Sequence, residues 1–252
     1  MARMEMAPPA RLCGAGRLRA PIRGVWRLMG DSVAEAIRSR RAVRAFRPDP
    51  VPAGTVRALL DLAARAPSGS NMQPWRAYAV TGGVREALCE ALVAAYLAGD
   101  VGEPAHRYYP EEFFEPYRGR RRAVGLGLYA LLAIPKGDSE RMRAQHARNF
   151  RFFDAPVGLV FTIDRRLAVG SWLDYGGFLQ TLMIAARARG LDTCPQAAFA
   201  PYHAVIRRHL PLTPDESVVC GMALGYADPE APENRLLPER EPVEGFATLL
   251  GF

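Results

Sequence analysis

Apolar residues recur every three or four positions in several stretches of the chain, which is the spacing of one face of an α-helix. Helices are predicted on this basis from Asp31 to Ile37, at 56–63, at 84–98, in two stretches before residue 155, at 172–189 and at 202–209. The strongest stripe, in 172–189, consists of Tyr175, Phe178, Leu179, Leu182, Met183 and Ala186. Gly190 is expected to end this helix. Alternation at 75–81 and largely apolar segments at 155–163 and 217–224 predict three strands.

Polar residues mark the boundaries between these elements. Ser32 followed by Glu35 has the pattern of a helix capping box, and Ser171 with Asp174 is expected to cap the long helix. The sequences "APSGSNMQPW" (66–75) and "GLDTCPQAAF" (190–199) are predicted to be loops, and the Pro-rich end of the chain, 226–252, is expected to be extended. The pattern indicates a mixed α/β chain with one folded domain and no internal repeat.

Composition narrows the classes of protein that fit this pattern. The chain has 252 residues, 49% of them hydrophobic and 23% charged, as in an ordinary globular domain. No apolar run approaches the roughly 18 residues that a membrane-spanning helix needs. The four cysteines and four histidines are scattered, without the spacing of a zinc site or a disulfide framework. We therefore expect a cytoplasmic protein without a metal site or a membrane partner.

The positive charge is concentrated at the N-terminus. Residues 1–29 carry six arginines and one acid, so they contribute +5 of the net charge of +7. This segment lacks the continuous apolar region of a secretory signal. We expect residues 1–29 to be a disordered basic leader and residues 30–252 to form the folded domain. A nucleic-acid partner is not expected, because the remainder of the chain is nearly neutral.

A second cluster of arginines lies inside the predicted domain. The segment "RSRRAVRAF" (38–46) contains Arg38, Arg40, Arg41 and Arg44, with apolar residues between them. A solvated face would not contain Val43 and Phe46, which favour burial, whereas a site for an anion would use the planar, bidentate donors of guanidinium groups. A helical turn would direct Arg40 and Arg44 to one point. The sequence contains neither a Rossmann G-x-G-x-x-G after a strand nor a P-loop, so any phosphate is bound in another way.

Four segments in register resemble the FMN-dependent nitroreductase family: "RSRRAVRAF", "APSGSNMQPWR", "GLDTCPQAAF" and the terminal "GYADPEAPENRLLPEREPVEGF". The resemblance covers roughly residues 31–252. It implies an α+β fold, a three-layer sandwich whose central, mainly antiparallel sheet is flanked by helices. It also implies a homodimer with two FMN sites at the subunit interface. We expect the stripe of 172–189 and the tail 226–252 to supply apolar surface to that interface.

The resemblance assigns cofactor roles to the arginine cluster. Arg40 and Arg41 match positions that hold the FMN phosphate and ribityl chain. Arg44 matches a cation beside N1 and O2 of the flavin, where negative charge accumulates on reduction. Ala42 stands where the family commonly has a serine, so one hydrogen bond to the cofactor is expected to be missing.

Two other segments are implied to complete the cofactor site. Arg240 matches a late arginine that binds the phosphate, and Arg235 is the alternative candidate for that role. Pro67, Ser68 and Asn71 match a loop that reaches the flavin from the second subunit.

The segment "PQA" is implied to lie against the flavin itself. Pro195, Gln196 and Ala197 match residues along its dimethylbenzene-to-N5 side, where a backbone N–H meets N5. Cys194 precedes them, but without a neighbouring base it is interpreted as a small buried residue rather than a nucleophile.

Residues 100–122 are expected to be irregular, and 103–122 match the family's variable lid. Phe113, Phe114 and Tyr117 either stack on an aromatic substrate or pack on the partner subunit. Arg118 and the arginines at 120–122 either attract an acidic substrate or are simply solvated.

The resemblance therefore predicts an oxidoreductase of the nitroreductase type. It would take hydride from NADPH or NADH and pass electrons through FMN to a small nitroaromatic or quinone-like acceptor by ping-pong kinetics. No catalytic side chain is predicted, because the flavin supplies the chemistry. Two alternatives within the fold are synthesis of a cobalamin ligand from a flavin and reductive dehalogenation. A non-catalytic flavin-binding protein is a third alternative.

Overall fold

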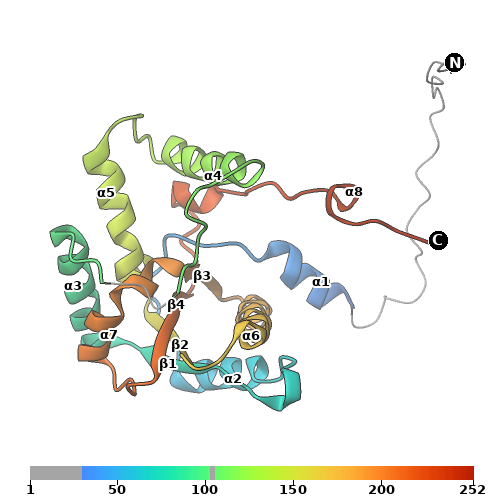
Figure 1. Ribbon diagram of the computed structural model, residues 1–252. Helices are drawn as coiled ribbons and strands as arrows, with labels where there is room; N and C mark the ends of the chain where they lie inside the picture. Colours follow the sequence, from blue (N-terminus) through green and yellow to red (C-terminus); the bar gives the residue numbers. More distant parts are fainter. Residues whose placement is uncertain (1–29, 103–105) are drawn as a thin grey trace, which may run out of the picture.

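A four-stranded antiparallel sheet forms the centre of the molecule, in the order β1-β2-β4-β3 (Figure 1). The strands are β1 (Arg76–Val80), β2 (Val157–Asp164), β3 (Asp192–Gln196) and β4 (Glu216–Gly225). The computed structural model describes residues 30–102 and 106–252, without the side chains of 30–32. The predicted leader, 1–29, lies outside this part of the chain.

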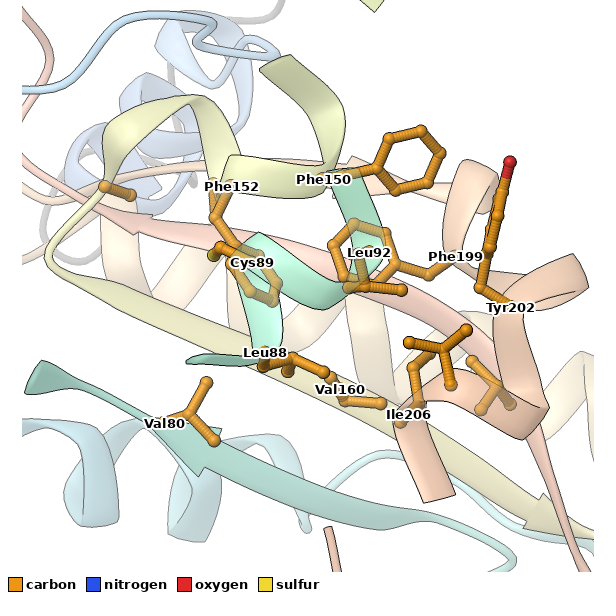
Figure 2. Packing of buried hydrophobic residues seen from close by; sticks show 14 of the residues in the cluster. Val80, Leu88, Cys89, Leu92, Phe150, Phe152, Val160, Phe199, Tyr202 and Ile206 are labelled. Atoms are coloured by element: carbon orange, nitrogen blue, oxygen red, sulfur yellow. The ribbon is translucent and has the colours of Figure 1, made fainter. Parts of the chain in front are cut away.

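Helices cover both faces of the sheet. β2 is apolar at nearly every position, so its side chains are buried on both sides. Leu159, Phe161 and Ile163 pack with α2 (Ala53–Ala63) and α6 (Val169–Arg187). Val160 lies in the other cluster, with residues of α3 (Gly82–Ala98) and α7 (His203–His209), as Figure 2 shows. Successive residues of a strand point to opposite faces, so a continuous apolar run is what a sheet between two helical layers requires. The predicted α+β, three-layer sandwich is confirmed.

The remaining helices lie around this sandwich. They are α1 (Gly30–Ser39), α4 (Tyr117–Leu131), α5 (Ser139–Ala147) and α8 (Val243–Phe246), with 3₁₀ turns η1 (Gly69–Asn71), η2 (Arg148–Asp154), η3 (Ala197–Tyr202) and η4 (Pro232–Arg235). Figure 1 shows the C-terminal tail with α8 projecting away from the sandwich. No helix in residues 30–102 and 106–252 is long and apolar enough to cross a membrane.

Most predicted helices and strands are present, but three local predictions were wrong. Residues 192–196, expected to be loop, form β3, because pairing with β4 outweighs the weak strand propensity of a segment that contains Asp192 and Pro195. Residues 40–44 are extended rather than helical. The arginines at 118 and 120–122 lie in α4 rather than in an irregular lid, which ends at Pro116.

The two predicted helix caps were also wrong. α1 begins at Gly30, so Ser32 lies inside the helix. α6 begins at Val169, which places Ser171 and Asp174 inside that helix as well. The side chain of Asp174 binds a loop instead, as described below.

The apolar stripe of α6 is not free for a partner. Tyr175, Phe178 and Leu182 are almost fully buried in the cluster formed with α2 and the sheet. The expectation that this stripe forms part of a dimer interface is therefore wrong. The tail differs, because Leu249 and Leu250 are 71% and 80% exposed.

Candidate functional site

The arginine segment is an extended strand-like loop fixed to the sheet by its backbone. Ala42 forms a parallel bridge with Thr193 of β3, and the N–H of Val43 donates to the carbonyl of Thr193 at 3.1 Å. Phe46 forms a second bridge, to Ala227. Val43 and Phe46 are buried in the core. The apolar residues therefore anchor the loop, and the neighbouring Arg40, Arg41 and Arg44 remain partly exposed.

Three of these arginines form an uncompensated positive cluster. Arg40, Arg41 and Arg44 are half-buried. None of them forms an ion pair with a carboxylate in residues 30–102 and 106–252. The guanidinium of Arg44 donates to the carbonyl of Ala42 at 3.2 Å. Because half-buried cations without carboxylate partners favour a bound anion, this donor set fits the phosphate and the N1–O2 edge of FMN.

The positive charges of Arg44 and Arg40 lie close enough to β3 to affect the pKa of the buried Cys194 thiol. Burial raises the pKa of Cys194 to about 11, and the charges of Arg44 and Arg40 oppose that rise. Both cations therefore act on the same point of β3 although the segment between them is not helical. Cys194 remains a neutral thiol at physiological pH, which agrees with its interpretation as a structural residue.

A buried asparagine joins the arginine loop to the C-terminal part of the chain. Oδ1 of Asn234 accepts from the backbone N–H groups of Arg44 at 2.7 Å and Ala45 at 3.2 Å. Its Nδ2 donates to the carbonyls of Ala45 at 2.8 Å and Asp228 at 2.9 Å. The neighbouring Glu233 is also buried and forms an ion pair with Arg148.

The segment 195–197 continues directly from the part of β3 that holds the arginine loop. Gln196 is buried and pairs with Gly221 of β4, while its Nε2 donates to the carbonyl of Asn149 at 2.6 Å. Just beyond it, the ring of Phe199 lies so close to Gly221 that a Cβ there would be 2.7 Å from it. These contacts fix the backbone around Ala197. Pro195 and Ala197 follow Thr193, the residue of β3 that pairs with Ala42 of the arginine loop, by two and four positions.

A cavity of about 560 Å³ borders this segment. Pro195, Gln196 and Ala197 form part of its wall. The remaining wall is largely aromatic and includes Tyr96, His106, Tyr108, His146, Phe150 and Tyr202. Such a wall suits a flat aromatic molecule.

Loop 67–73 has a different anchor. Oδ2 of Asp174 accepts from the hydroxyl of Ser68 at 2.8 Å and from the N–H of Gly69 at 3.0 Å, and the Ser68 hydroxyl accepts from the N–H of Gln73 at 2.8 Å. These bonds support three non-glycine residues in the left-handed region, namely Ser70, Asn71 and Gln73. Pro67 and Asn71 are exposed.

The length of α6 separates this loop from the arginines. Asp174 holds loop 67–73, while the guanidinium of Arg187 donates to Ser39 at 3.0 Å, next to the arginine loop. These two positions are thirteen residues apart in one helix, which corresponds to about 20 Å. The structure thus does not bring Pro67, Ser68 and Asn71 to Arg40 and Arg44 of the same chain.

The two late arginines are placed differently with respect to the cluster. Arg240 is exposed and donates only to nearby carbonyls of the tail, those of Pro238 and Glu239, among the described residues. Glu241 pairs with Arg120 of α4. Arg235 is exposed and follows Asn234 directly.

The lid region combines aromatic and positive side chains. The guanidinium of Arg121 lies 4.5 Å from the ring centre of Phe113. A surface cavity of about 760 Å³ is lined by these two residues and by Tyr109, Phe114, Tyr117 and Arg120, among others. Arg118 and Arg120 are paired with Glu115 and Glu241. Two of the four predicted lid arginines are therefore compensated by carboxylates.

Sequence reasoning missed Asn234 and misassigned Asp174. Asn234 lies in "PENRLL", where no local pattern marks it as functional, because its partners are 189 and 190 positions away. Asp174 was interpreted as a cap because of its spacing from Ser171. No local pattern reveals that its carboxylate binds Ser68, 106 positions away.

The described part of the chain was predicted to lack a metal site. In residues 30–102 and 106–252, no group of three or more His, Cys, Asp or Glu side chains is arranged to hold a metal ion. The site instead offers guanidinium donors, a fixed backbone segment and an aromatic cavity.

Comparison with known proteins gives a consistent result. The Nitroreductase family profile matches residues 37–226. The chain is 44% identical over 219 residues to the nitrobenzene nitroreductase of Ectopseudomonas oleovorans, covering 86% of this chain and 96% of that protein. It is also 44% identical over 225 residues to the 4-nitrobenzoate reductase of Pseudomonas putida, covering 89% and 98%.

A solved structure extends the similarity to three dimensions. The FMN-dependent nitroreductase NfnB of Mycobacterium smegmatis, determined in complex with NADPH, superposes with a TM-score of 0.83 and 34% identity, covering 87% of this chain and 98% of that one. The resemblance inferred from the four segments is thereby confirmed. The chain belongs to the nitroreductase family and is an FMN-dependent, NAD(P)H-dependent oxidoreductase of the nitroreductase type.

Proposed function

We propose that this enzyme reduces small nitroaromatic compounds with electrons from a nicotinamide nucleotide, at a flavin site that two copies of the chain complete. The observation that carries this proposal is the uncompensated cluster of Arg40, Arg41 and Arg44 beside a fixed backbone segment and an aromatic cavity. Bound FMN supplies the chemistry, accepting a hydride from the reduced nicotinamide and returning electrons to the acceptor.

In this proposal, different arginines bind different parts of the cofactor. Arg40 and Arg41 bind the phosphate and ribityl chain through charge-assisted hydrogen bonds. Arg44 directs its positive charge to the N1–O2 edge, where reduction places negative charge. The backbone N–H of Ala197 meets N5, and the pairing of Gln196 with Gly221 keeps it in place. Arg240, with Arg235 as the alternative, adds a phosphate contact when the tail is docked.

A second copy of the chain supplies loop 67–71. Within one chain, α6 binds this loop at Asp174 and the residue before the arginine loop, Ser39, at Arg187, about 20 Å further along the helix, which is too far for both segments to contact one flavin ring. The exposed apolar tail, with Leu249 and Leu250, provides surface suited to a stable homodimer. Light scattering of purified, FMN-loaded protein at micromolar concentration tests this directly, and a stable flavin-loaded monomer would contradict it.

The nicotinamide and the acceptor use one face of the site in turn. The aromatic cavity beside Pro195–Ala197 borders the proposed flavin segment. One planar ring occupies such a space at a time. Steady-state rates should accordingly give parallel double-reciprocal lines, with inhibition by excess of either substrate. Intersecting lines would contradict the shared site.

The acceptor is a nitroarene. The aromatic cavity supports this class, and the similar proteins named above include one nitrobenzene nitroreductase and one 4-nitrobenzoate reductase. A screen of nitrobenzene, 4-nitrobenzoate and quinones with NADPH and NADH tests the proposal. Inert nitroarenes together with rapid dehalogenation of halogenated phenols would move the function to another reaction of the same fold.

A further inference from the structure

Asn234 uses its whole hydrogen-bonding capacity on backbone groups. Its Oδ1 accepts two bonds and its Nδ2 donates two, all between 2.7 and 3.2 Å. The side chain is only 3% exposed. A buried amide with every polar atom satisfied specifies one local geometry, because any shift would leave a buried donor or acceptor without a partner.

One of these bonds involves Arg44, the residue that carries the cation proposed for the flavin, and two involve the next residue, Ala45. Arg44 gives its N–H to Asn234, and the following Ala45 is bound through both its N–H and its carbonyl. Just upstream, Val43 is held by Thr193 of β3. The backbone of Arg44 is thus fixed on both sides, and the Asn234 side is the one that belongs to a distant part of the sequence.

The same asparagine also fixes the start of the tail. It lies in η4 beside Glu233, whose buried carboxylate pairs with Arg148. Arg235 and Arg240 follow it along the chain. Asn234 is therefore the point at which the arginine loop and the segment with the late arginines are joined.

We propose that Asn234 is a positioning residue that orients the Arg44 guanidinium toward the flavin by holding the Arg44–Ala45 backbone. The inference rests on the proposed role of Arg44. It assigns no contact with the flavin to Asn234 itself. The part of its effect on FMN that passes through Arg44 should vanish when the Arg44 side chain is removed, which leaves only the smaller effect through the tail.

A double-mutant cycle tests this dependence. FMN is titrated into apoprotein prepared from wild type, Asn234→Ala, Arg44→Ala and the double variant, and the flavin midpoint potential is measured in each loaded protein. Asn234→Ala should raise the Kd for FMN about tenfold in the wild-type background and by less than about twofold in the Arg44→Ala background. Its midpoint potential should become more negative, because reduced flavin loses an aligned cation.

Tyr78→Phe is the matched control for lost stability. Its hydroxyl donates to the buried carboxylate of Glu216 at 2.8 Å. Glu216 precedes Gly221 by five residues in β4, which places it about 17 Å from the flavin segment. This variant should lose stability while keeping the FMN affinity and midpoint potential of the wild type. If Asn234→Ala does not fold, Asn234→Asp, which keeps the volume and the acceptor oxygen, is carried through the same cycle.

The outcomes separate this inference from the proposed function. Equal effects of the Asn234 substitution in both backgrounds, or an unchanged midpoint potential, overturn the positioning role while leaving Arg44 in place. An Arg44→Ala protein that binds FMN and is reduced as the wild type is would remove the proposed role of Arg44 and this inference with it. Loss of the Asn234 effect only when Arg44 is absent supports the proposal.

Discussion

The arginine loop and loop 67–73 are both assigned to the flavin, yet they are held in different ways. The arginine loop is fixed over its length, by Thr193 and Ala227 on the sheet side and by Asn234 from the tail. Loop 67–73 is exposed and is anchored through one carboxylate, that of Asp174. The contrast indicates that one chain can preform the cation half of the site. In the proposed site, the other half comes from the loop of a second chain.

The largest effect should come from removing the fixed cation. Arg44→Ala should slow reduction of the flavin by NADPH about 10²-fold, because the charge that develops at N1–O2 loses its donor. Stopped-flow absorbance measures this step. Arg47→Ala is the control, since Arg47 is exposed in the same loop and pairs with Asp49. A comparable loss in both variants would mean that general charge, rather than the position of Arg44, matters.

Mixing two inactive chains sharpens the comparison between the loops. One chain carries Arg44→Ala and the other Ser68→Ala with Asn71→Ala, and the two are unfolded together and refolded. If the halves come from different chains, each heterodimer has one intact site, so about a quarter of wild-type activity should return. A site built within one chain would leave every heterodimer site damaged, and no activity would return.

A smaller effect is expected at the phosphate. Arg40→Ala should weaken FMN binding roughly tenfold, because one charge-assisted hydrogen bond contributes about 1.5–3 kcal/mol. Excess FMN should restore much of the activity, in contrast to Arg44→Ala. Titration of the apoprotein measures the affinity. An unchanged affinity would place the phosphate elsewhere.

The smallest effect on the flavin is expected at the far end of the sheet. Burial would raise the pKa of Glu216, but hydrogen bonds from Thr162, the N–H of Thr213 and Tyr78 lower it below its usual value. A lowered folded-state pKa contributes stability above the unfolded-state pKa, and that stability is lost as the pH falls through the folded-state pKa. Tyr78→Phe should cost about 1.5–3 kcal/mol of unfolding free energy at pH 7.

Two further measurements complete this prediction. The difference in unfolding free energy between Tyr78→Phe and wild type should shrink in acid as Glu216 becomes protonated. Urea unfolding at several pH values measures it. FMN affinity should stay unchanged, and a loss of affinity would show that the two ends of the sheet are coupled.

The helical and apolar patterns predicted burial correctly in elements whose own sequence shows which side chains are buried. The stripe of α6 and the continuous apolar run of β2 predicted burial on the correct residues. Prediction failed at β3 and at the caps. β3 exists because β4 offers it hydrogen-bonding partners, and Asp174 binds a loop rather than its own helix end.

The sequence by itself determined the family and the sandwich of helices on an antiparallel sheet, and it predicts the arginine loop as an anion site. These properties reside in local periodicity and in motifs that keep their spacing. Only the tertiary structure decided that Asn234 holds Arg44 from 190 positions away, and that loop 67–71 and Ser39 are bound at positions of α6 about 20 Å apart. The reason is physical, since hydrogen bonds between distant segments depend on how the chain packs, and no local pattern records that packing.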